Sequence, residues 1–239
     1  MRNAAGGLLV APLSISAPEG HVGSDLETVP NPVIHSCHIL DPAHDAARIE
    51  VVDSEVLHTG TRMGYSRSKI VDAGGHGRVI ALVEGQGVRI GTPPEGLTKM
   101  EEDRLEIADS PDLPSLWEAF GAFRRADGHW ALPESAEELA SPDAALHIGP
   151  QHVLLETAAI DLAAVLTGTD RLQMQTWHVM FLARGKAGPF RVDGEAVHGT
   201  AGKVGVRLTL HDEGADDRRV TSASAILQVV DGTDTGNRS

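Results

Sequence analysis

Cysteine, basic residues and long apolar runs are all scarce in this chain of 239 residues. The single cysteine, Cys37, cannot form an internal disulfide. Only 20 lysines and arginines face 34 aspartates and glutamates, and the net charge of −14 argues against a nucleic acid as partner. No apolar run approaches the roughly 20 residues that cross a bilayer, and no charged start with an apolar run marks a signal peptide. We therefore expect a cytoplasmic protein with no membrane partner.

Two stretches 140 residues apart are near copies, Val52–His58 and Val192–His198. With this offset and no gap, residues 31–84 match residues 171–224 at eleven of 54 positions, where chance gives roughly one in fifteen. Coincidence between two β-rich segments is the alternative. Matches spread over the whole window at one offset favour an internal duplication instead.

Each repeat window has the pattern of four consecutive antiparallel strands, with β-branched or alternating runs separated by glycine or charge clusters. The predicted strands are 33–40, 48–58, 63–71 and 79–90 in the first window and 172–182, 190–198, 204–211 and 220–230 in the second. We interpret each window as a four-stranded meander.

Residues 93–144 form a connector between the repeats. Apolar residues at helical spacing predict a short amphipathic helix there, which packs on a sheet or covers a pocket mouth; they are Leu116, Trp117, Phe120 and Phe123. The most apolar helical run of the chain follows at 153–166 and predicts a buried central helix. Its counterpart 140 residues earlier contains a proline and two glycines, which break helices.

The sequence thus predicts an α+β fold with a long central helix retained only in the second half. The expected parts are an N-terminal half over 1–92 that lacks its helix, the connector over 93–144, a C-terminal half over 145–231 and a disordered tail over 232–239. An uncovered apolar sheet in the first half would need cover from another part of the full-length chain or from a second protomer, and we expect a homo-oligomer.

Candidate catalytic groups lie on the predicted central helix. Asp161 falls in its middle, where a carboxylate needs either hydrogen bonds from neighbours or a wet cavity, and it could act as base or nucleophile. His152 falls at the predicted helix start, where free N–H groups can stabilise an oxyanion, or it has no catalytic part. Glu156 is a second carboxylate candidate, with an exposed or paired structural role as the alternative. The run from His147 to His152 lacks the further ligands that a metal site needs.

At this point the pattern resembles the hotdog-fold acyl-CoA thioesterases related to the phenylacetate-pathway enzymes. In that family a His-Gly-Gly sequence opens the central helix and a catalytic carboxylate follows nine residues after the histidine, a spacing that His152 and Asp161 have. The resemblance implies that Asp161 activates water or attacks the thioester, and that the Val153 N–H binds the oxyanion. This chain has Val153-Leu154 in place of the two glycines, which would narrow the acyl approach or abolish catalysis.

The resemblance further implies a double hotdog of two antiparallel sheets, one active site between the halves, an acyl-CoA as partner and no cofactor. Three cations around a glycine-containing loop could bind the anionic coenzyme, although solvated turn charges explain them as well; they are Arg184, Lys186 and Arg191. The leading hypothesis is an acyl-CoA thioesterase. The alternatives are a non-catalytic hotdog module that binds acyl-CoA or another small molecule, and a hotdog hydratase or dehydratase.

Overall fold

The computed structural model describes residues 9–10, 13, 29–74, 77–90, 112–134, 136–141 and 143–230. Eight long strands form two sets of four. The first set is β1 (Val29–Ile39), β2 (Ile49–Thr59), β3 (Met63–Asp72) and β4 (Val79–Ile90). The second set is β7 (Leu172–Phe181), β8 (Phe190–His198), β9 (Lys203–Asp212) and β10 (Arg218–Val229). All eight predicted strands are confirmed to within a few residues, whereas the predicted tail over 232–239 lies outside the described residues.

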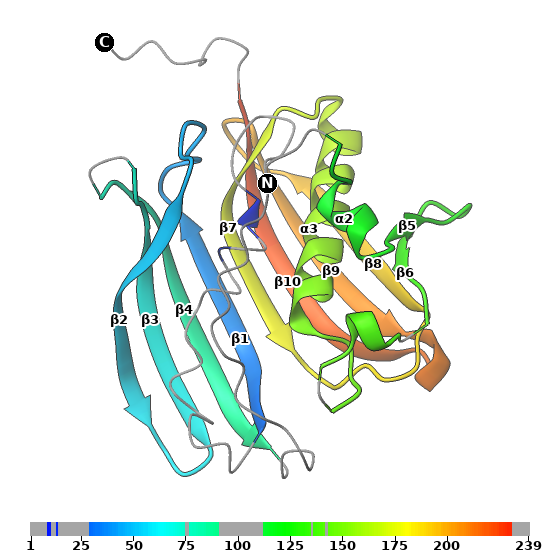
Figure 1. Ribbon diagram of the computed structural model, residues 1–239. Coiled ribbons are helices and arrows are strands. Elements are labelled where there is room, and N and C mark those ends of the chain that lie inside the picture. The colour runs from blue at the N-terminus through cyan, green and yellow to red at the C-terminus, as the bar shows by residue number, and fades with distance from the viewer. Residues whose placement is uncertain are drawn as a thin grey trace.

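One continuous sheet of ten strands runs through the molecule, in the order β2-β3-β4-β1-β7-β10-β9-β8-β6-β5 (Figure 1). The two short strands at its end are β5 (Phe123–Arg124) and β6 (Trp130–Leu132). The prediction of two separate sheets is therefore wrong. The antiparallel pairing of β1 with β7 joins the two sets, and Cys37 lies opposite Trp177 at this seam.

The strand order within each set differs from the predicted meander, because the first strand pairs with the fourth and not with the second. This places β1 and β7 at the centre of the sheet, where both of their backbone edges are paired. The two sets share this order, and Cys37 and Trp177, which face one another, are 140 residues apart. An ion pair between β2 and β3, Glu55 with Arg67, also has its counterpart between β8 and β9.

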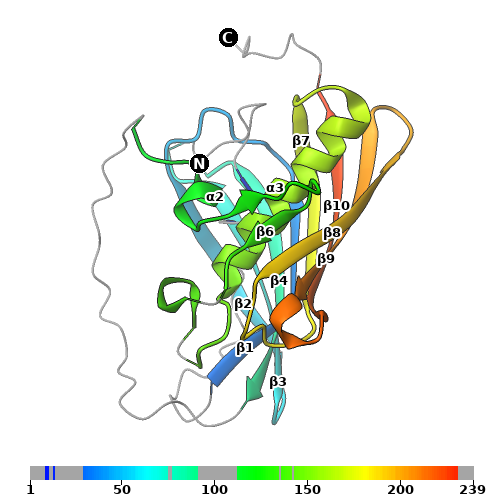
Figure 2. The ribbon, with the colours of Figure 1, turned by 90° about the vertical axis from the view of Figure 1, so that its right-hand side faces the viewer.

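The long helix α3 (Ile148–Thr167) lies against the face formed by β7 to β10 (Figure 2). It starts five residues before the predicted 153, with His147 as N-cap. Pro150 is compatible with this earlier start because the first turn of a helix needs no N–H partner. The helix ends at Gly168, whose φ of 72° is in the left-handed region that glycine adopts readily.

The connector forms less helix than its apolar spacing predicted. The helix α2 covers only Leu116–Ala119, and Phe123 lies on strand β5, so the predicted helical face is wrong at that residue. Gly121 has a φ of 68°, which turns the chain away from the helix. Trp117 still packs edge-on against Trp130 of β6, with ring centroids 5.2 Å apart. The short 3-10 segments η1 (Glu137–Leu139) and η2 (Glu213–Ala215) complete the described elements.

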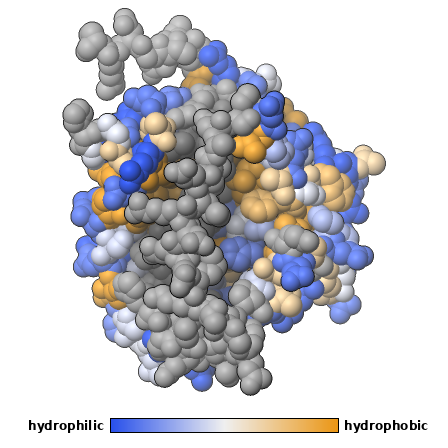
Figure 3. All heavy atoms as spheres, viewed as in Figure 1, coloured by the Kyte–Doolittle hydropathy of each residue, from blue (hydrophilic) through white to orange (hydrophobic). Residues whose placement is uncertain are grey.

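Two residues near the N-terminus, Val10 and Leu13, are helical and buried. The first repeat therefore has some helix before it, although most of the stretch 13–26 lies outside the described residues. On the face seen in Figure 3, hydrophobic residues gather on the side of α2 and α3. Within the described parts of the chain, no helix combines the length and apolarity that crossing a membrane requires.

Candidate functional site

A pocket of about 190 Å³ opens at the N-terminal end of α3, beside the seam between β1 and β7. Both sets of strands and the start of the helix contribute to it. Its lining consists of Asn31, Pro32, Leu146, Ile148, Gln151, Phe181, Leu182, Ala183 and Arg184. The walls are thus mostly apolar, with one guanidinium and two amides, as is usual for sites that bind small molecules.

Among the described residues, one backbone N–H in the first turn of α3 has no hydrogen-bond partner. Pro150 has no N–H, and Gly149 donates to the Nδ1 atom of its N-cap residue His147 at 3.2 Å. Ile148 remains, and it lines the pocket. A helix N-terminus carries partial positive charge, so this N–H can bind an anionic or carbonyl oxygen.

Two of the three predicted coenzyme-binding cations lie near the pocket. The Arg184 guanidinium donates to Asp143, to Ser141 and, at 2.5 Å, to the side chain of Asn31. Lys186 donates to the Asp143 carbonyl oxygen at 3.2 Å. Asp212 accepts from the Lys186 backbone N–H, and Arg218 donates to the Arg184 carbonyl oxygen. With two carboxylates against three cations, this edge of the pocket has a net charge of about +1, which favours an anionic ligand.

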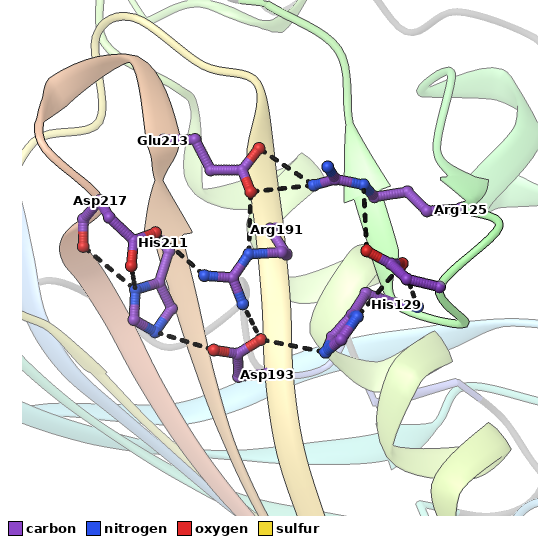
Figure 4. Close-up of polar contacts among 8 residues, drawn as sticks. Arg125, His129, Arg191, Asp193, His211, Glu213 and Asp217 are labelled. Carbon is purple, nitrogen blue, oxygen red and sulfur yellow. Dashed lines mark hydrogen bonds and ion pairs between the residues drawn. The ribbon is translucent and has the colours of Figure 1, made fainter.

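Arg191, the third predicted cation, lies in a different environment. It belongs to a network of two arginines, two histidines and four carboxylates (Figure 4). Its guanidinium donates to Asp193, Glu213 and Asp217. The network places four carboxylates around two arginines, and this surplus of acidic side chains disfavours phosphates. Arg191 therefore supports the sheet and does not add positive charge to the pocket.

His152 is fully buried in the second turn of α3 and not at its start, because the helix begins at Ile148. Its Nδ1 atom accepts from the Trp177 indole at 3.0 Å, and its Nε2 atom lies 3.1 Å from Nδ1 of His35. Burial, with a smaller contribution from His35, lowers its pKa well below the usual value. Val153 is the sixth residue of the helix, so its N–H is inside the helical ladder and is not a terminal donor.

Glu156 is one turn beyond His152 on the same face of α3 and has only 2% of its surface exposed. Its Oε1 atom accepts from the Val10 backbone N–H at 2.7 Å. The carboxylate also acts on β1, because burial first and then the Glu156 charge raise the pKa of the Cys37 thiol to about 12. His152, one turn earlier on the same face of α3, contacts His35 of β1, so this face of the helix is directed toward the seam between the two sets of strands.

Asp161 lies about 180° around the helix from His152, because each residue of an α-helix turns by about 100°. Its carboxylate is 26% exposed and pairs with Arg124 of β5, at the opposite end of the sheet from β2, with a shortest N–O distance of 3.3 Å. The helix therefore does not bring His152 and Asp161 together. Among the described residues, no group of three or more histidine, cysteine or acidic side chains is arranged to hold a metal ion.

No protein-family model and no curated protein sequence matches the chain. Solved structures do match it. The TesB protein of Mycobacterium avium subspecies paratuberculosis is 13% identical, with a TM-score of 0.63 over 97% of this chain and 90% of its own. The chain shares the fold of thioesterases. The predicted likeness to hotdog-fold thioesterases is thereby confirmed at the level of the fold.

Two further structures show the range of this likeness. Acyl-CoA thioesterase II TesB2 of Mycobacterium marinum is 16% identical, with a TM-score of 0.57 over 85% of this chain and 82% of its own. The 12:0-ACP thioesterase of Umbellularia californica is 10% identical, with a TM-score of 0.55 over 86% and 75%.

Sequence reasoning missed His147 and His35 as site residues. The signal for His147 was present, since Gly149-Pro150 is compatible with a first helical turn and makes His147 the residue that opens the helix. Nine residues after His147 stands Glu156, the same spacing that pointed to His152 and Asp161. For His35 there was no local signal, because its contacts with α3 cross 117 residues of sequence.

Proposed function

We propose that the protein hydrolyses an acyl thioester, with Glu156 as the catalytic carboxylate, and that it is a double hotdog produced by duplication. The observation that carries the catalytic proposal is the place of Glu156: it is buried, and it lies one helical turn beyond His152, whose ring contacts His35 of β1 at the seam. The catalytic role predicted for Asp161 passes to Glu156, because Asp161 lies on the opposite side of the helix from His152 and pairs with Arg124.

The chemistry follows from this arrangement. The carboxylate of Glu156 takes a proton from water as the oxygen of that water attacks the thioester carbonyl. The Val153 N–H, to which the resemblance gave the oxyanion role, lies inside the helical ladder, and the terminal Ile148 N–H is eight residues, about 12 Å of helix, from Glu156. The Ile148 N–H would therefore contact the ligand near Arg184 and not at the reacting carbonyl. The tetrahedral intermediate then collapses and the carbon–sulfur bond breaks. The departing thiolate takes the proton from Glu156 and leaves as the thiol. The positive edge at Arg184 and Lys186 would receive the anionic carrier, for which we propose coenzyme A.

Duplication is supported by three observations that do not depend on one another. The matches at a constant offset of 140 fall in strands of the same rank, and the two sets have the same strand order. Cys37 and Trp177 are equivalent positions that pair at the seam, as a twofold relation between two units requires.

Thiol release from a panel of short, long and aromatic acyl-CoAs tests the catalytic proposal. Glu156→Gln and Asp161→Asn are matched carboxylate-to-amide changes on one helix. We expect the first to lower the rate by about 10² or more and the second to change it by no more than a few-fold. A large loss confined to Asp161→Asn would return the role to Asp161, and equal rates in all three proteins would refute both assignments.

A second function, binding of acyl-CoA without hydrolysis, has one specific observation in its favour. The described pocket lining includes no carboxylate, while Glu156 is engaged by Val10 and Asp161 by Arg124. Saturable binding of acyl-CoA by a protein that releases no thiol from any member of the panel would favour this function.

A further inference from the structure

Three buried rings form a hydrogen-bonded chain from β7 through α3 to β1. The Trp177 indole Nε1 lies 3.0 Å from His152 Nδ1, and His152 Nε2 lies 3.1 Å from His35 Nδ1. The two imidazole planes are nearly parallel, with centroids 5.4 Å apart and an interplanar angle of 8°. None of the three side chains is more than marginally exposed, so water does not compete for these contacts.

The proton positions along this chain follow from its first member. An indole N–H can only donate, so His152 Nδ1 must accept. Burial lowers the pKa of His35 to about 4 and that of His152 well below its ordinary value, so both rings are neutral near pH 7. His152 therefore carries its proton on Nε2 and donates it to His35 Nδ1. As a result, the one proton of His35 is on Nε2.

That last N–H group has no acceptor among the residues that the structure describes. His35 Nε2 is buried and makes no hydrogen bond there. An unsatisfied buried donor carries a substantial free-energy penalty, and most buried polar groups in proteins do have a partner. The chain of three rings thus ends in the His35 Nε2–H group, whose position is fixed and which water does not reach. Such a donor can bind an acceptor atom of a ligand.

His35 lies between the features already assigned to the site. His35 is two residues from Cys37 on β1, so the two side chains lie on the same face of the strand. The Glu156 charge contributes to the raised pKa of the Cys37 thiol. The ring of Phe181, which lines the pocket, meets His35 and His152 edge-on, with centroids 5.4 and 5.6 Å away. His35 is therefore adjacent both to the pocket wall and to the face of the seam that carries the carboxylate.

We propose that His35 donates a hydrogen bond from Nε2 to the carbonyl oxygen of a bound acyl group. His152 and Trp177 are positioning residues that fix the tautomer of His35. A neutral N–H in a dry site polarises the carbonyl and binds more strongly as negative charge develops on its oxygen. The choice of a thioester carbonyl rests on the proposed function, whereas the need for an oxygen acceptor rests on the hydrogen-bonded chain alone.

Two acyl-CoA analogues test this proposal in the full chain. One is a ketone with a methylene in place of the sulfur, which keeps the carbonyl and cannot be hydrolysed. The other is the matched thioether, which lacks the carbonyl oxygen. By calorimetry, we expect His35→Phe to weaken ketone binding by about tenfold and to change thioether binding by less than about twofold. His35→Gln, whose amide can donate, should recover part of the loss.

Nuclear magnetic resonance of the wild-type protein with 15N-labelled histidine gives the same answer without a variant that must fold. We expect the His35 ring proton on Nε2 in the free protein and a downfield shift of that proton with the ketone but not with the thioether. The proposal would be overturned if the two analogues had equal effects, if the ketone left the chemical shift of the His35 Nε2 proton unchanged, or if neither analogue bound. The shift without thiol release would refute only the hydrolase, and thiol release without the shift would refute only the role of His35.

Discussion

The buried histidine His35 makes the stability of this protein depend on pH in a defined window. In the folded protein burial lowers its pKa to about 4, while in the unfolded chain the value returns to about 6.5. Below pH 6.5 the unfolded state therefore binds a proton that the native state does not. Stability is complete above pH 6.5 and falls as the pH drops toward 4, where the loss levels off.

The magnitude follows from the size of the shift. Each pH unit within the window costs about 1.4 kcal/mol per proton, so His35 alone removes about 2 kcal/mol between pH 6.5 and pH 5, and about 3 kcal/mol by pH 4. His152 acts in the same direction, because its pKa is also lowered by burial. A domain of this kind has a total stability of roughly 5–15 kcal/mol, so the effect is large enough to measure.

Urea unfolding at pH 7.5, 6.5, 5.5 and 5.0, followed by circular dichroism, checks this prediction. The control is His35→Gln, which cannot titrate. Histidines that do not contact His35 contribute equally to both proteins, so the difference between the two pH profiles reports His35 together with its effect on His152. We expect the wild type to lose about 2 kcal/mol more than the variant between pH 6.5 and pH 5. Parallel profiles would show that His35 is not buried in its neutral form.

Three further predictions concern packing, reactivity and the outer edge of the sheet. Gly214→Ala should lower the free energy of unfolding by about 2 kcal/mol or more, because the new Cβ would overlap the Gly188 carbonyl oxygen. The control is Gly74→Ala at the matching repeat position, where the new Cβ meets only a carboxylate oxygen at 3.6 Å. This control should lower the free energy of unfolding by less than about 1 kcal/mol. Cys37, with its pKa raised to about 12, should resist thiol reagents at pH 8 until urea unfolds the chain; rapid labelling of the native protein would contradict its burial. Arg124→Ala should change the urea midpoint by less than the equivalent of about 1 kcal/mol, since its ion pair is partly exposed.

Much of the fold could be predicted from the sequence because strand signals are local. The alternation of apolar and polar residues located all eight long strands, and the repeat showed that they form two corresponding sets. The start of α3 was misplaced because Gly149 and Pro150 usually mark helix breaks. The first turn accepts both residues, since its N–H groups need no helical partner.

The candidate site was predicted less well, for a reason that His152 illustrates. Its spacing to Asp161 is that of a catalytic pair in the family that the sequence resembles. Nine residues are two and a half turns of an α-helix, however, so the two side chains lie on opposite sides of the helix. Glu156 was named as a weak candidate, and its burial on the face of α3 that contacts β1 through His152 is what strengthens it. Arg191 had the right charge for a phosphate, and only the folded network showed that carboxylates already surround it.

By itself the sequence determined the strands, their division into two sets and the buried character of the helix, because each of these depends on neighbours along the chain. The tertiary structure decided that β1 and β7 join the sets into one sheet, and that His35 and Glu156 face this seam. These relations connect residues more than a hundred positions apart. Pairing over such separations is fixed by packing of the whole chain, which no local pattern encodes.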